Sequence, residues 1–135
     1  MLKRISVFFA AGAVGGLVNA LLFWAAGMGD TKLAFGYKVS SKLSEAYLLP
    51  KIVWGGVWAM LFFLPFPKDW STLRKGLIVS VVPSALQLFY VYPFVMDKGV
   101  LGIELGYTTP AFVLAFNAVW GLAAGYWAFF SGEKV

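Results

Sequence analysis

Charged residues are confined to short blocks of the chain, and four long runs between these blocks contain none. The runs are Ile5–Gly27, Ile52–Phe66, Gly76–Met96 and Tyr107–Phe130. Three of them exceed the roughly 20 residues that a helix needs to cross a bilayer, whereas the second has 15 and needs help from its flanks. The pattern predicts an all-α integral membrane protein, folded as a four-transmembrane-helix bundle in a single domain, 1–135.

Prolines and charged residues set the expected helix boundaries. The helices are predicted over 5–27, 50–66, 76–96 and 108–130. Pro50 suits the first turn of the second helix, and Lys51 is expected to snorkel to the headgroups. A start near Ser41 or Ser44, with a kink at Pro50, is the alternative.

The stretch before the second helix is too apolar for a disordered linker and too charged to span the membrane. Residues 28–50 are therefore predicted to form a structured outer loop, with 28–49 lying in the membrane interface.

The N-terminus has one feature of a signal peptide, because Lys3 and Arg4 precede an apolar run. That run is longer than the roughly 7–15 apolar residues of a signal peptide. Trp24 also stands where a cleavage site requires a small side chain. The segment is therefore interpreted as an uncleaved first transmembrane helix.

A shift of 66 residues aligns LLFW (21–24) with QLFY (87–90) and VWG (53–55) with VWG (119–121). One offset that matches both helices of a hairpin indicates a tandem duplication of a two-helix unit, related by an axis along the membrane normal. The identities are few, and a biased composition raises the number of chance matches. A chain without an internal repeat is therefore an equal alternative.

The composition narrows the chemistry. Only 13% of the residues are charged and 61% are apolar, against about 25% charged in soluble domains. Cysteine and histidine are both absent, which excludes disulfides, iron–sulfur clusters, and haem or zinc held by histidine. We expect no cofactor and no metal, with bound lipid left open. Aromatic residues near helix ends, Tyr92 among them, are expected to anchor in the interface.

The net charge of +5 comes from basic residues that flank apolar segments. This arrangement is typical of membrane proteins, so membrane lipids are expected partners and nucleic acid is not. Tight clusters such as Lys3/Arg4 and Arg74/Lys75 favour both termini in the cytoplasm, in a bacterial cytoplasmic (inner) membrane. The total is nearly even, with six basic residues on the N-terminal side and five on the other, which is also typical of dual topology.

Three carboxamides fall at one depth. Asn19, Gln87 and Asn117 lie about 12–14 Å from the predicted non-cytoplasmic helix ends, at ~1.5 Å per residue. Ser80 and Ser84 continue from Gln87 as one polar stripe. Trp54 and the Tyr90 hydroxyl are expected to approach the layer. The candidate polar layer is Asn19, Ser80, Ser84, Gln87 and Asn117.

Small residues share the faces of the two asparagines. Gly12 and Gly16 form a GxxxG pair beside Asn19, and Gly121 and Gly125 form another beside Asn117. Glycines let two helices approach, and amides then bond across the gap, each contributing about 0.6 kcal/mol and up to ~2. These glycines are predicted helix-packing residues. The layer is interpreted as interhelical contact, with a solute-binding constriction as the alternative.

No paired carboxylates, nucleophile–base set or phosphate loop is present, so catalysis is not expected. The favoured function is a non-catalytic small integral membrane subunit, or an assembly partner, of a larger membrane complex. The first alternative is a small homo-oligomeric channel or transporter that passes a neutral or weakly charged solute along the amide layer. The second is a lipid-binding or membrane-shaping protein.

Overall fold

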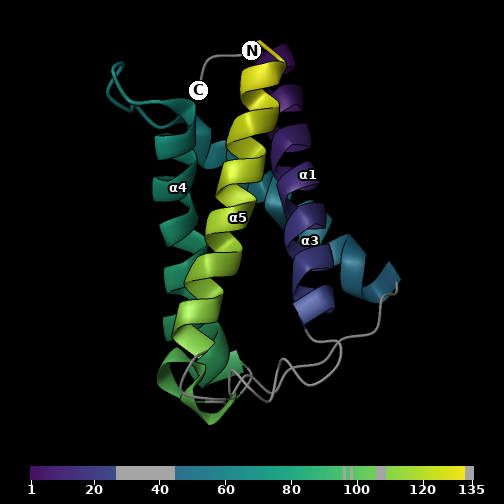
Figure 1. Ribbon diagram of the computed structural model, residues 1–135, viewed down its shortest axis with the longest axis vertical. Coiled ribbons are helices and arrows are strands. Elements are labelled where there is room, and N and C mark those ends of the chain that lie inside the picture. Colours follow the sequence, from purple (N-terminus) through teal and green to yellow (C-terminus); the bar gives the residue numbers. More distant parts are fainter. Residues whose placement is uncertain (27–44, 96, 98, 106–108, 133–135) are drawn as a thin grey trace.

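The computed structural model describes residues 1–26, 45–95, 97, 99–105 and 109–132. This described part is helical and contains no strand (Figure 1). Most of the predicted outer loop, 28–50, lies outside the described residues. In chain order the elements are α1 (Leu2–Ala26), α3 (Glu45–Trp58), the 3-10 segment η1 (Ala59–Phe63), α4 (Thr72–Leu86), the π-helix η2 (Gln87–Val95), the short 3-10 segment η3 (Val100–Leu105) and α5 (Thr109–Phe130).

Three helical stretches are long and apolar enough to cross a membrane: Leu2–Leu22, Thr72–Val95 and Pro110–Phe130. These correspond to the first, third and fourth predicted helices. The remaining apolar helix, Leu48–Phe63, is shorter.

The second helix differs from the predicted range 50–66 at both ends. It begins at Glu45 and continues through Pro50, as in the alternative with an earlier start. Its 3-10 extension ends at Phe63, and Leu64 is extended with ψ 148°. The cause is Pro65, because the ring of a proline disfavours the helical conformation of the preceding residue.

The third helix starts earlier than predicted and changes type along its length. Ser71 caps α4 by accepting a hydrogen bond from the Arg74 amide at 3.2 Å. Pro83 lies inside α4 and has no N–H to donate. Four residues later the backbone N–H of Gln87 donates to both the Pro83 and Ser84 carbonyls. From Gln87 the chain continues as the π-helix η2.

The four long helices form a curved row in the order α3, α1, α5, α4. In Figure 1, α1 and α5 lie side by side, and the start of α1 and the end of α5 are at the same end of the molecule. α3 packs on α1, and α4 packs on α5, whereas α3 and α4 hardly meet within the described residues. A duplicated hairpin would pack α3 on α4 as α1 packs on α5. The duplication therefore stays a prediction.

Glycines lie where the helices approach most closely. A Cβ at Gly12 would collide with the Gly55 carbonyl, and one at Gly16 with the Lys51 carbonyl. These two glycines therefore set the separation of α1 and α3.

The contact between α4 and α5 is built in a similar way. A Cβ at Gly121 would collide with the Gly76 carbonyl of α4. At Gly125 the fit is looser, because the nearest atom to an added Cβ is the Thr72 carbonyl oxygen at 3.2 Å.

Two apolar clusters fill the bundle at different levels. The larger one lies toward the end where α1 begins and comprises Phe8, Ala11, Ala59, Phe62, Val79, Trp120, Ala124 and Ala128. The smaller one lies near the start of α5 and comprises Leu88, Tyr92 and Val113, with Leu101 packed against it. The predicted amide layer falls between these two clusters.

Candidate functional site: a polar cavity between the helices

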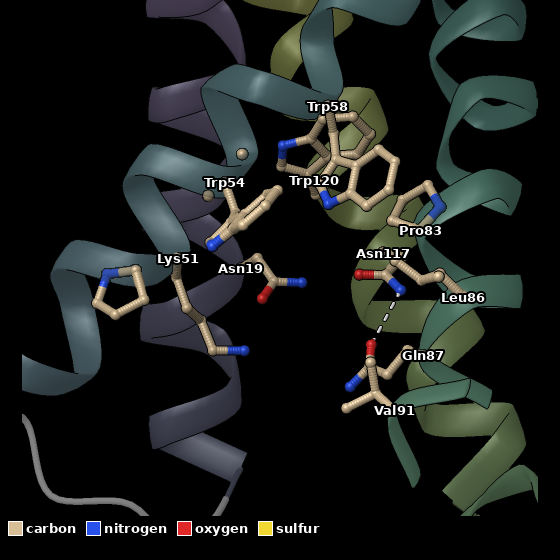
Figure 2. Close-up of a pocket in the computed structure, with 13 residues that line it drawn as sticks. Asn19, Lys51, Trp54, Trp58, Pro83, Leu86, Gln87, Val91, Asn117 and Trp120 are labelled. Carbon is tan, nitrogen blue, oxygen red and sulfur yellow. Dashed lines mark hydrogen bonds between the residues drawn. The ribbon is translucent and has the colours of Figure 1, made fainter. Parts of the chain in front are cut away.

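A cavity of about 390 Å³ opens between α3 and α4 at the level of the carboxamides. All four long helices contribute to its wall, and Figure 2 shows their side chains converging on one space. The lining residues are Gly16, Asn19, Pro50, Lys51, Trp54, Gly55, Trp58, Pro83, Leu86, Gln87, Val91, Asn117 and Trp120.

Asn19 joins α1 to α5. Its Nδ2 donates a hydrogen bond to the Phe116 carbonyl oxygen at 2.7 Å, and the side chain is 8% exposed. Such a contact satisfies an amide where there is little water to do so. The carboxamide also lines the cavity. One asparagine therefore serves as a helix contact and as part of the cavity wall.

The other two carboxamides form a chain of hydrogen bonds between α5 and the third helix. Asn117 Nδ2 donates to Ser84 Oγ at 3.0 Å and, more weakly, to Gln87 Oε1 at 3.5 Å (Figure 2). Gln87 Nε2 in turn donates to the Tyr92 hydroxyl at 3.0 Å. The chain holds both amide groups in fixed positions beside the cavity.

Both serines of the predicted stripe donate to carbonyls of their own helix, and Ser84 Oγ also accepts from Asn117. The Ser80 hydroxyl donates to the Leu77 carbonyl at 2.6 Å, and the Ser84 hydroxyl donates to the Ser80 carbonyl at 2.8 Å. Both serines are buried, and neither is among the lining residues. The structure thus brings Asn19, Gln87 and Asn117 to one cavity and leaves the two serines behind its wall.

Tyr92 takes the place that was expected for Tyr90. Tyr90 is exposed and does not line the cavity, whereas Tyr92 is buried and binds Gln87. The expected interface anchor at Tyr92 is therefore wrong. The reason is the π-helix, whose i to i+5 periodicity brings Tyr92 beneath Gln87.

Two tryptophans of α3 and one of α5 form an aromatic wall. Trp54, which was expected to approach the layer, does line the cavity, and its ring centroid lies 6.4 Å from that of Trp58. Trp120 lies across the backbone of Gly15, where no Cβ would fit, and its Nε1 donates to the Gly12 carbonyl at 3.1 Å. This indole fixes the α1–α5 contact beside the cavity.

Lys51 is the charged lining residue, and the sequence analysis did not assign it to the layer. Figure 2 shows its ammonium group extending into the space between Asn19 and Gln87. Its backbone lies against Gly16, so the close packing of α1 and α3 determines where this side chain starts. Its position beside Trp54 and Trp58 could have been predicted from their spacing along α3, since residues three and seven apart share a helix face.

The cavity is open on one side and closed on another. Trp54 and Leu86 line it and are also 58% and 43% exposed, so its mouth lies at the outer surface between α3 and α4. Toward the end where α1 begins, the larger apolar cluster blocks it, with Trp120 belonging to both. The cavity lining therefore ends at Trp120 on this side.

Within the described part of the chain, no acidic group lines the cavity wall. Neither aspartate nor glutamate is among its lining residues, and Lys51 is the one charged residue among them. Across the described residues, no group of three or more histidine, cysteine, aspartate or glutamate side chains lies close enough to hold a metal ion.

Comparisons with protein-family models, with curated proteins and with solved structures gave no match to this chain.

Proposed function

We propose that this chain is a non-catalytic protein of four membrane spans that binds an amphipathic, lipid-like ligand in the cavity between α3 and α4. The supporting observation is the cavity itself, which combines largely apolar walls with a few converging polar side chains, opens sideways on the apolar surface and is blocked toward the end where α1 begins. Ligand sites of this kind combine apolar walls with a few converging polar groups.

The fourth span is α3 together with η1. Its 14 α-helical and 5 3-10 residues extend about 31 Å at ~1.5 and ~2.0 Å per residue. This length is close to the ~30 Å hydrocarbon core. A helix of that length, packed along α1, crosses the bilayer with α1, α4 and α5.

The position of the mouth favours a ligand that arrives from the membrane. Trp54 and Leu86 stand at the mouth on helices that face lipid, so an acyl chain can lie between them while a polar group enters the cavity. A solute that crosses the membrane would need a path past Phe8 and Phe62, which are buried in the larger apolar cluster. The channel alternative is therefore less well supported.

The role of a subunit in a larger complex has also lost part of its support. Glycine-rich helix faces and buried amides would favour such a role where they contact a partner helix. Here Gly12, Gly16 and Gly121 pack against helices of the same chain, and Asn19 binds a carbonyl of the same chain. These features are accounted for without a partner.

Native mass spectrometry tests the proposal. The protein in a non-ionic detergent would be titrated with phospholipid, and adducts would be counted. We expect one retained lipid per chain in the wild type. Leu86→Trp narrows the mouth and should lose this lipid.

Val82→Trp is the matched control, since Val82 lies on the same helix, is 44% exposed against 43% for Leu86, and does not line the cavity. It should retain the lipid. No stoichiometric adduct in the wild type, or equal adducts in both variants, would overturn the proposal.

A further inference from the structure

We propose that the cavity recognises a lipid whose headgroup carries hydroxyl groups, which donate hydrogen bonds to the side-chain oxygens of Asn19 and Asn117. This inference rests on the proposed function and adds the chemical class of the ligand. It starts from the orientation of the two carboxamides, since each has a donor end and an acceptor end.

The donor end of each carboxamide is fixed by the group that it meets. Asn19 Nδ2 donates to the Phe116 carbonyl, which can only accept. Asn117 Nδ2 donates to Ser84 Oγ, whose single proton is already donated to the Ser80 carbonyl. A reversed amide would place two acceptors against each other in the first case and leave Ser84 without a second proton to donate in the other. The position of each Oδ1 atom follows from these contacts.

Both oxygens are available to a ligand as acceptors. Asn19 and Asn117 line the cavity, and their Oδ1 atoms accept no hydrogen bond from the residues that the structure describes. Figure 2 shows the oxygen of Asn117 on the side that faces Asn19. A buried carbonyl oxygen without a donor costs free energy. A ligand that donates to these two oxygens removes this cost, whereas a ligand that offers acceptors alone does not.

The same wall also contains N–H donors, which favours a hydroxyl over other donors. A carboxamide has two N–H groups. Gln87 Nε2 uses one of them on the Tyr92 hydroxyl, and Asn19 Nδ2 uses one on the Phe116 carbonyl. A hydroxyl can donate to an Oδ1 atom and accept from a second N–H group. An ammonium group can only donate, and an ether or ester oxygen can only accept.

The mouth of the cavity favours a lipid over a free polyol. The volume of about 390 Å³ accommodates a headgroup of the size of glycerol but not two acyl chains. The chains would lie outside, across exposed Trp54 and Leu86. Free glycerol would make the same polar contacts and leave this apolar surface uncovered.

The test is a competition between two lipids of equal charge that differ in their hydroxyl groups alone. Phosphatidylglycerol has two hydroxyls on a three-carbon headgroup, and phosphatidylpropanol has the same carbons and neither hydroxyl. The chain, purified in lauryldimethylamine oxide, a detergent without hydroxyl groups, would be exposed to an equimolar mixture with identical acyl chains. Bound lipid would be counted by native mass spectrometry. We expect a preference of about five- to tenfold for phosphatidylglycerol, the size expected of two hydrogen bonds in a membrane protein.

Variants assign the preference to the two oxygens. Asn19→Leu and Asn117→Leu each remove one acceptor and should each lower the ratio of bound phosphatidylglycerol to phosphatidylpropanol, and the double variant should bind both lipids equally. Ser80→Ala is the control, because Ser80 is buried and bonded within its own helix but does not line the cavity. It should keep the wild-type ratio. The ratio separates recognition from stability, since a loosened bundle loses both lipids alike.

The outcomes separate this inference from the proposed function. Equal binding of the two lipids by the wild type would overturn the recognition of hydroxyl groups and leave lipid binding in place, and this comparison needs no variant to fold. Absence of any bound lipid would overturn both. A preference that survives in the double variant would show that the carboxamide oxygens are not its source, and displacement of phosphatidylglycerol by excess glycerol would overturn the assignment to a lipid.

Discussion

Replacement of Asn19 by leucine is the most direct test of how the bundle is held together. The substitution keeps a side chain of similar size and removes the donor that joins α1 to the Phe116 carbonyl at 2.7 Å. Leucine gains little by burial here, because lipid is as apolar as the protein interior. The lost hydrogen bond therefore determines the result.

The expected loss in the free energy of unfolding is about 0.5–2 kcal/mol. Interhelical hydrogen bonds in membrane proteins contribute about 0.6 kcal/mol on average and at most ~2. The Phe116 carbonyl lies within α5, where it also accepts a backbone hydrogen bond of the helix. It therefore still has a donor after the Asn19 side chain is removed. This consideration favours the lower half of the range.

The assay is reversible unfolding in mixtures of dodecyl maltoside and dodecyl sulfate, followed by tryptophan fluorescence. Val18→Leu serves as the control, because the neighbouring Val18 is exposed on the outer face of α1 and a change there should stay within about 0.5 kcal/mol. If Asn19→Leu unfolds like the wild type and yet loses bound lipid, the carboxamide acts on the ligand alone, and its assignment as a helix contact is refuted.

Three further predictions concern packing and topology. Gly121→Ala should destabilise the fold by about 1–3 kcal/mol, as overpacking does, because the new Cβ would meet a backbone carbonyl of α4. Gly125→Ala should cost clearly less, because the nearest atom to its Cβ is 3.2 Å away. Equal unfolding curves for the two variants would contradict the described packing of α4 on α5. Trp120→Phe removes the indole donor to an α1 carbonyl and should cost about 0.5–1.5 kcal/mol in the same assay. An unchanged stability would mean that this bond does not stabilise the fold. Lys68 and Glu104 are both exposed and lie at opposite ends of the bundle. In intact cells, an impermeant thiol reagent should label a single cysteine at position 104 and should not label one at position 68. Labelling of both positions would indicate dual topology.

The positions of the long helices could be predicted from the sequence because the membrane imposes one requirement on all of them. A charge-free run of about 20 residues has no stable alternative to a helix in lipid. The ranges 5–27 and 108–130 agree with α1 and α5 within a few residues. The second helix was less certain, since Pro50 is compatible with both a helix start and a helix interior.

The contents of the cavity could be predicted only in part. Asn19, Gln87 and Asn117 were expected at a common level because each is a fixed number of residues from a helix end, and all three line one cavity. Lys51 was placed at the headgroups because the second helix was expected to begin beside it. With α3 beginning at Glu45, the same lysine lies more than one turn inside the helix.

Tyr92 shows the limit of reasoning from regular periodicity. On an α-helix, residues 87 and 92 point in different directions, so no pattern in the sequence pairs them. The π-helix η2 brings them together, and its start at Gln87 follows Pro83 by one turn. A proline inside a helix commonly bends it, but the change of helix type depends on which carbonyls find donors. That choice is made by tertiary contacts.

Helix contact and binding site were treated as competing interpretations of the carboxamides, and the geometry gives a physical reason to combine them. Close packing at Gly16 brings α3 onto α1 and places Lys51 beside Asn19. Close packing at Gly121 holds α4 on α5 and keeps it away from α3. The space between the two tight pairs is the cavity, and the amides that hold the pairs together form its wall. A change that loosens either pair should therefore alter stability and lipid retention together.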